Sequence, residues 1–352
     1  MNLLQLLDRL VQPLGPPGRE DQVRELVREL VTPHAHKVEV DRMGNLQAWL
    51  NPGTRPLVML DAHLDEVGLV VQRVEESGFL RIASLGGPDP RVLPGSRVLL
   101  QPRPGRQVTG VVGLLPPHVE KGAEAEKALP WERLYVDLGV ADAAGARELG
   151  VEVGTPGVVE AGHGPLGQGC YHARNLDNRV GCALACALLE RLAAAPPAFG
   201  LCCNFSVAEE VGLRGATTAA FGIAPDLALV LEATVGDTPG VEAARNPSVL
   251  GRGPAVTVAD GRIVVPWYLV ESLEQAAARA GVAWQRKLPP YGGTDAGAIA
   301  LSRGGVPTAV LSVPTRYIHT PVSVLNLGDL EATLQLALAW LQEAGGLCGE
   351  PR

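Results

Sequence analysis

The sequence predicts an α/β sandwich built on a mixed sheet, with a small, mainly β domain inserted into it. From about residue 170 onward, short apolar strands alternate with helical stretches, a pattern typical of an α/β sandwich. Residues 66–159 instead carry short β-like runs punctuated by Gly and Pro. At 352 residues the chain is long enough for two domains. We therefore expect one discontinuous domain over 1–65 and 160–352, and a second domain over 66–159.

The first sixty residues are expected to form two helices followed by strands. Apolar residues recur with helical spacing at about 2–12 and again at about 20–31. Residues 57–60, LVML, are predicted to form a strand that is buried on both faces and ends at Leu60. This strand belongs to the larger domain.

The inserted region is expected to be a small barrel of the PDZ-like kind. Its β-like runs are VVQRV, FLRIA, SRVLLQ, VTGVVGLL and LYVDLGV, and only one short helix is expected, near 141–149. Several short strands at regular spacing, separated by turn residues, are typical of small β barrels. Residues 66–159 thus differ in pattern from the chain on either side of them.

The second half of the chain returns to alternating helices and strands. The segment 178–194 is apolar almost all round, as expected for a helix buried against a sheet. The runs GLCCNFSVA, LALVLEA and PTAVLSVP follow as strands. A last helix is predicted over about 326–344, with Asn326 as its N-cap and Gly345 at its end.

Composition excludes several classes of protein. The net charge is −8, and no Lys/Arg cluster with interleaved aromatic residues is present, so nucleic acid is not an expected partner. No apolar stretch approaches the roughly 20 residues of a membrane helix. The N-terminus lacks the basic region and cleavage site of a signal peptide. Six cysteines without a C-x-x-C pair indicate reduced thiols, so we expect a cytoplasmic protein.

Polar residues collect where predicted strands end. In open α/β sheets such ends meet at the crevice where ligands bind. One further carboxylate, that of Asp177, lies at the start of the buried helix, where the helix dipole favours a negative charge. The set comprises Asp61, His63, Asp65, Asp177, Glu209, Glu210, Glu232 and His319. Each residue alone has an ordinary structural explanation, and their joint appearance is what indicates a site.

So many carboxylates in one cleft need either protons or metal ions. Histidine and carboxylate ligands without cysteine suit zinc, cobalt or manganese. The set is large enough for two divalent ions roughly 3.5–4 Å apart. Glu209 is then free to act as a general base, and Asp65 is placed to accept a hydrogen bond from the second ring nitrogen of His63. The pattern predicts a hydrolytic metal site.

Six motifs occur in the order DAHLDEVG, RNLDNR, AEEVGLRGA, GDTPG, GGTDAG and RYIHTP. Together they resemble the motifs of the M42 family of metallo-aminopeptidases, dinuclear metal enzymes that include glutamyl and deblocking aminopeptidases. The resemblance runs over essentially the whole chain. It implies peptide substrates, a β domain that serves in dimerisation, and dimers that build a hollow tetrahedral dodecamer.

The same resemblance implies a role for each site residue. His63 and Glu232 would hold one metal ion, Glu210 and His319 the other, and Asp177 would bridge the two. Glu209 would be the general base, and Asp65 would orient His63. Thr294 and Asp295, in the GGTDAG loop, would border the substrate pocket.

One position departs from the family pattern. Members usually carry Asp where this chain has Glu232, and Glu is longer by one methylene. Its carboxylate reaches the same ion if the strand sits slightly further back, or if it binds bidentately. The change bears on the metal preference or occupancy of one site. Asp237, in GDTPG, is a fallback ligand.

Three other activities stay open at this stage. A related dinuclear N-deacylase or dipeptidase would keep the metals and change the substrate. A glucanase would use Glu209 with another carboxylate and no metal, which leaves the two histidines unexplained. A non-catalytic scaffold is the third alternative, although every candidate ligand and the base are present.

Overall fold

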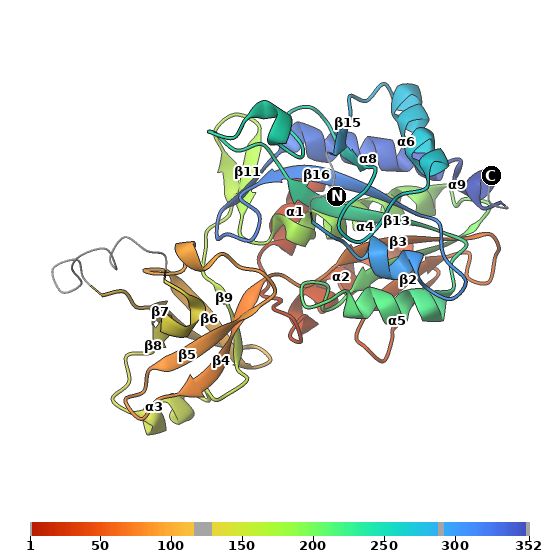
Figure 1. The fold of residues 1–352 in the computed structure, drawn as a ribbon. Helices are drawn as coiled ribbons and strands as arrows, with labels where there is room; N and C mark the ends of the chain where they lie inside the picture. The colour runs from red at the N-terminus through yellow and green to blue at the C-terminus, as the bar shows by residue number, and fades with distance from the viewer. Residues whose placement is uncertain (1, 116–128, 288–291, 350–352) are drawn as a thin grey trace.

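The computed structural model describes residues 2–115, 129–287 and 292–349. It forms two lobes, an α/β sandwich and a β barrel (Figure 1). The mixed sheet and the inserted barrel predicted from the sequence are both confirmed. In the described part of the chain, no helix has the length and apolar character needed to cross a membrane.

The large sheet has eleven strands in the described part of the chain. Its main path, in spatial order, is β1 (Lys37–Val40), β2 (Leu46–Leu50), β12 (Gly200–Ser206), β3 (Leu57–His63), β13 (Leu227–Val235), β16 (Thr308–Arg316), β17 (Ser323–Asn326), β11 (Cys170–Ala173) and β10 (Gly164–Leu166), with β14 (Ala255–Thr257) and β15 (Gln285–Lys287) off this path. The four central strands β12, β3, β13 and β16 are parallel, and antiparallel strands flank them. Their carboxyl ends therefore lie at one edge of the sheet, as a shared binding crevice requires.

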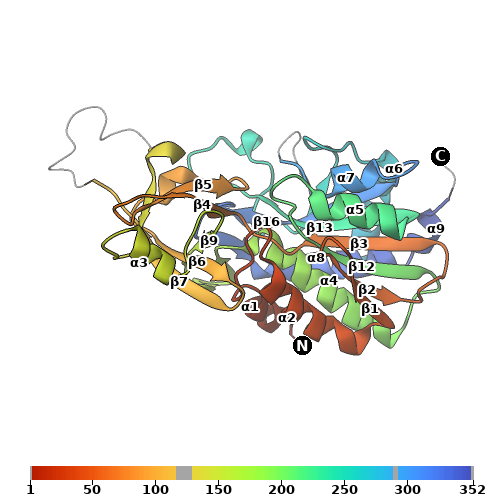
Figure 2. The same ribbon diagram turned by 90° about the horizontal axis from the view of Figure 1, so that it is seen from below.

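Helices cover both faces of this sheet (Figure 2). The helices are α1 (Leu3–Leu10), α2 (Asp21–Val31), α4 (Leu176–Ala194), α5 (Arg214–Ile223), α6 (Trp267–Ala280), α7 (Ala296–Ala300), α8 (Leu327–Leu341) and α9 (Ala344–Leu347). Helix α4 packs on β3 and β13 and is flanked by α1, α2 and α8, whereas α5 and α7 lie on the other face. The nearly all-apolar sequence of α4 is explained because both the sheet and other helices surround it.

The barrel is closed by six antiparallel strands. These are, in order around it, β4 (Gly68–Val74), β5 (Leu80–Leu85), β8 (Tyr135–Asp137), β7 (Arg106–Val112), β6 (Arg97–Arg103) and β9 (Pro156–Val159), with α3 (Ala143–Glu148) outside them. Its core is a separate apolar cluster that includes Leu80, Val98 and Leu100. Closure removes the exposed edges that so small a sheet would otherwise present.

Two predicted element ends are wrong. Strand β3 continues past Leu60 to His63, because β12 pairs with all seven of its residues, from Gly200 opposite Leu57 to Ser206 opposite His63. Helix α8 begins after Asn326, as predicted, and the Asn326 side chain accepts hydrogen bonds from the first turn.

Helix α8 ends at Leu341, however, and Gly345 lies in the separate short helix α9. A Cβ on Gly345 would lie 3.0 Å from the Phe199 ring. Gly345 is therefore explained by close packing and not by helix termination.

Candidate metal centre

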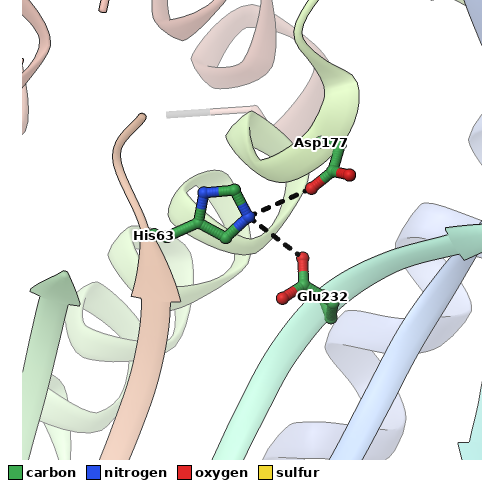
Figure 3. A group of neighbouring side chains, drawn as sticks. All are labelled: His63, Asp177 and Glu232. Carbon is green, nitrogen blue, oxygen red and sulfur yellow. Dashed lines mark hydrogen bonds and ion pairs between the residues drawn. The ribbon is translucent and has the colours of Figure 1, made fainter. Parts of the chain in front are cut away.

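The first half of the site is built around His63, at the end of β3. Its Nε2 lies 3.1 Å from Asp177 Oδ1 and 3.6 Å from Glu232 Oε1. Figure 3 shows the ring nitrogen facing both carboxylates, which come from the start of α4 and from within β13. Asp177 has non-helical backbone angles, so it precedes the regular part of α4. Three separate elements thus bring these ligand atoms together.

The second half is built around His319, in the loop after β16. Its Nε2 lies 3.3 Å from Asp177 Oδ2 and 3.3 Å from Glu210 Oε1. The two carboxylate oxygens of Asp177 therefore face two different histidines. This is the arrangement expected of a carboxylate shared between two ions.

Asp65 and Glu209 lie next to these ligands. The Asp65 carboxylate accepts hydrogen bonds from the backbone amides of Glu209, at 3.0 Å, and Glu210, at 3.1 Å. The Nδ1 atom of His63 is 3.1 Å from the Asp65 backbone carbonyl and 3.4 Å from its carboxylate. Asp65 therefore contacts His63 chiefly through its main chain, while its side chain holds the loop that carries the two glutamates.

The charges in the site depend on one another. Burial raises the pKa of Glu209 well above its usual range, and burial also raises the pKa of Glu232 to about 7. Although burial opposes it, hydrogen bonds from His319 and His63 hold the pKa of Asp177 below its ordinary value. Burial likewise works against His319, whose pKa is nevertheless raised to about 11 by Asp177 and Glu210. The site thus favours positive charge between its carboxylates.

The donor atoms fit divalent cations. Within the described ranges, three groups have possible ligand atoms that lie within 4.8 Å of one another: His63 with Asp177 and Glu232, His63 with Glu209 and Glu210, and Asp177 with Glu210 and His319. Imidazole nitrogen and carboxylate oxygen, without thiolate, suit zinc, cobalt or manganese. Divalent ions would replace the protons that otherwise occupy the histidines.

A buried polar layer lies beneath the candidate ligands, and sequence reasoning missed its two members on β12, Asn204 and Ser206. Asn204 of β12 donates to Asp61, at 2.6 Å, and Ser206 donates to Asp295, at 2.6 Å. Asp61 is within β3 and fully buried, so it supports the site from below. Thr294 and Asp295 are also buried. The predicted contact of these two residues with substrate stays a prediction.

A second group that sequence reasoning missed joins the loop after β3 to the start of α4. Glu66 accepts hydrogen bonds from the side chains of Arg174, at 2.8 Å, and Arg179, at 3.3 Å, and from the backbone amide of Gly15. All three side chains are largely buried. These partners are more than 100 residues from Glu66 in sequence, apart from Gly15, so no local pattern indicated them.

The fallback ligand Asp237 lies elsewhere. Its carboxylate pairs with Arg316 and accepts a hydrogen bond from the backbone amide of Leu250. It belongs to none of the three groups of ligand atoms found among the described residues. Glu232, by contrast, occupies the position next to His63.

Comparison with known proteins agrees with this architecture. The family model described as M42 glutamyl aminopeptidase matches residues 44–336. The putative aminopeptidase FrvX of Escherichia coli is 33% identical over 96% of this chain and 94% of its own. The lysyl aminopeptidase of Pyrococcus furiosus is 32% identical over 96% of each chain.

Solved structures show the same fold over both domains. The aminopeptidase APDkam598 from the archaeon Desulfurococcus kamchatkensis matches with a TM-score of 0.91 and 35% identity, covering 97% of this chain and 94% of that one. The structure of PhTET1, described as a dodecamer, matches with a TM-score of 0.86 and 29% identity, covering 96% and 98%. These matches define a class of enzyme, the aminopeptidases, which hydrolyse peptide bonds. Within that class, the chain belongs to the M42 peptidase family.

Proposed function

We propose that this aminopeptidase is metal-dependent, that its cleft binds two divalent ions, and that Glu209 is its general base. The observation that carries the proposal is the position of Asp177, whose two oxygens lie 3.1 Å from His63 and 3.3 Å from His319. A single carboxylate between two imidazoles is suited to bridge two ions.

The remaining ligands divide between the two ions. His63 and Glu232 would hold one, and Glu210 and His319 would hold the other. Zinc is the ion we expect, with cobalt or manganese as alternatives. When bound, the pair supplies Lewis-acid chemistry, because it polarises the scissile carbonyl and lowers the pKa of the attacking water.

The protein's own residues then move the proton and orient the ligands. Glu209 takes the proton of the attacking water and returns it to the leaving amine. The position of Glu209 suits this task, because its carboxylate lies 3.9 Å from Nε2 of His63, beside the proposed ions. Asp65 holds the Glu209–Glu210 loop through two backbone amides, and its main-chain carbonyl supports the His63 ring.

The test combines metal content with hydrolysis of aminoacyl-nitroanilides. Purified protein should lose activity on chelation and regain it with zinc, cobalt or manganese. A Glu209→Gln variant should keep its metal and lose turnover by roughly 10²–10⁴-fold, since a proton carrier of this kind contributes about that much. Glu148→Gln, on the exposed surface of α3, is the matched control.

Two results would contradict the proposal. Activity that survives complete removal of metal would show that the ions are not needed. Full activity of Glu209→Gln would show that another group takes the proton. Cleavage of acylated amino acids but not of nitroanilides would favour the N-deacylase alternative.

The proposal extends to assembly and location. PhTET1 is described as a dodecamer, and we propose that this chain also forms homo-oligomers in which residues 66–159 make the dimer contact. Light scattering would give the number of subunits, and a monomer at working concentration would contradict it. A cytoplasmic location is consistent with six cysteines that form no disulfide.

A further inference from the structure

Lys287, the last residue of β15, is a buried cation that has no partner among the described residues. Only 4% of its surface is exposed. Among residues 2–115, 129–287 and 292–349, no carboxylate lies within 4.0 Å of its ammonium group and no acceptor forms a hydrogen bond with it. Burying a charge without a pair is strongly unfavourable. A charge kept under these conditions requires an explanation.

Strand pairing places Lys287 on the face of the sheet that carries the metal ligands. Glu232 of β13 pairs with Ser312 of β16. Ser312 pairs in turn with Ala255 of β14, which pairs with Gln285 of β15. Residues paired in this way project from the same face, and side chains alternate along a strand. Lys287, two residues after Gln285, therefore projects from the same face as Glu232.

The ammonium group lies beside Gly292, two residues before Thr294. Its Nζ is 3.8 Å from the place that a Cβ on Gly292 would occupy. Burial lowers the pKa of Lys287, while the charges of Asp260, Glu232 and Asp177 act in the opposite direction. Lys287 is thus close enough to Glu232 and Asp177 to interact with their charges, yet it contacts neither.

We propose that Lys287 selects substrates whose first residue is acidic, by binding its side-chain carboxylate. This inference rests on the proposed function, because it assigns the substrate class of the same cleft. An ammonium–carboxylate hydrogen bond is among the stronger contacts available in a dry site. The substrate carboxylate would pair with the Lys287 ammonium group, which no carboxylate of the described residues contacts.

The competing explanation is that Lys287 only balances the charge of the metal ligands. Such a lysine would be expected in contact with a carboxylate, as Arg174 is with Glu66 at 2.8 Å. Lys287 makes no such contact in the part of the chain that is described. The two explanations also differ in what its removal does to metal binding, so they can be separated by experiment.

The experiment measures kcat/KM of the metal-loaded enzyme on glutamyl-, aspartyl-, leucyl- and lysyl-nitroanilide. For the wild type we expect the glutamyl or aspartyl substrate to be preferred. Lys287→Met should lower the ratio of glutamyl to leucyl kcat/KM by about 10- to 100-fold, as expected for the loss of one hydrogen bond to a charged group. Lys287→Arg should retain most of that ratio.

Arg286→Met is the matched control. Arg286 is the neighbouring residue of β15, is exposed, and pairs with Glu274. Its substitution removes the same charge from the opposite face of the strand, so the glutamyl to leucyl ratio should not change. Lys287→Glu should shift the preference toward lysyl substrates, because it reverses the sign of the buried charge.

Metal content and thermal stability complete the test. Lys287→Met should bind the same number of ions and should unfold at the same or a higher temperature, because it removes an unpaired buried charge. A lower metal content, or an equal loss of kcat/KM on all substrates, would overturn the inference in favour of charge balance. A wild type that hydrolyses leucyl but not acidic substrates would also overturn it. Failure to hydrolyse any of the four would instead contradict the proposed function.

Discussion

The two domains differ in what they bury. The barrel has an apolar core to which Leu69, Ile82 and Leu100 contribute, and its strands carry none of the candidate ligands. The sheet of the larger domain buries charged groups at the carboxyl ends of its strands, among them His63 and Glu232. The barrel core therefore contains none of the candidate ligands, whereas the sheet of the larger domain carries them at the carboxyl ends of its strands.

The free-energy cost of burying polar groups at the carboxyl ends of the strands is partly offset by hydrogen bonds among them. Asp61 accepts a hydrogen bond from Asn204, and Asp295 accepts one from Ser206. Burying such groups unpaired would cost roughly 1–3 kcal/mol each or more. The comparison therefore predicts that substitutions in the sheet end change metal binding, while substitutions in the barrel change stability.

The largest effect is expected at Asp177. Asp177→Asn keeps the size of the side chain but removes the negative charge that faces His63 and His319. We expect metal affinity to fall by more than the roughly 10- to 100-fold that the loss of an outer partner costs. Bound metal per chain, measured by mass spectrometry after dialysis, should drop below two ions.

The barrel offers the control for Asp177. Asp137→Asn, on the exposed side of β8, removes the same charge far from the ligands. It should leave the metal content unchanged. Loss of metal from Asp137→Asn, or two ions retained by Asp177→Asn, would contradict the prediction that only the larger domain binds metal.

The next effect is expected in the barrel core. Leu100 is fully buried there, so Leu100→Ala should lower the free energy of unfolding of the barrel by about 2–5 kcal/mol. Hydrogen exchange should accelerate in β6 and β7, while exchange in β3 and β13 and the metal content stay as in the wild type. Equal acceleration in both domains would show that the two cores unfold as one unit.

Much of this division could be predicted from the sequence. Apolar runs located the central strands. The candidate ligands His63, Asp177 and His319 could be picked out because they follow such runs or open a buried helix. Local signals of this kind suffice when a side chain's position follows from its own element. Asn326 is a further case, since a cap acts on the helix that directly follows it.

The remainder depends on contacts that the sequence does not display. Glu66 and Arg174 are 108 residues apart, and only the folded chain shows that they pair. The Asp65 carboxylate lies 3.4 Å from Nδ1 of His63, beside which it was expected. It also binds the backbone amides of the Glu209 loop, 144 residues away, and no local pattern indicated this second contact. Strand β3 continues through the polar residues Asp61 and His63 because β12 pairs with it there. The sequence of β3 alone does not show this pairing.

The smallest effect is expected at Glu20, a buried charge that links the N-terminal helices to the polar sheet end. Its Oε1 accepts hydrogen bonds from the backbone amides of Gly18, at 2.9 Å, and Ala208, at 3.2 Å. Burial, with the negative charge of Asp65, raises its pKa from 4.5 to about 6. The folded protein therefore binds this proton more tightly than the unfolded chain does.

The sign of the pH dependence follows from that shift. The stability that the Glu20 proton contributes is fully present below about pH 4.5 and is lost as the pH rises through about 6, a difference of about 2 kcal/mol. Glu20→Gln resembles the protonated form at every pH. In urea unfolding of metal-free protein, the variant should therefore gain about 2 kcal/mol on the wild type between about pH 4 and about pH 7. The matched control is Glu148→Gln, on the exposed face of α3. Its free energy of unfolding relative to wild type should not change between these two pH values. If the free energies of unfolding of Glu20→Gln and wild type instead change in parallel with pH, the pKa of Glu20 is not raised in the folded protein.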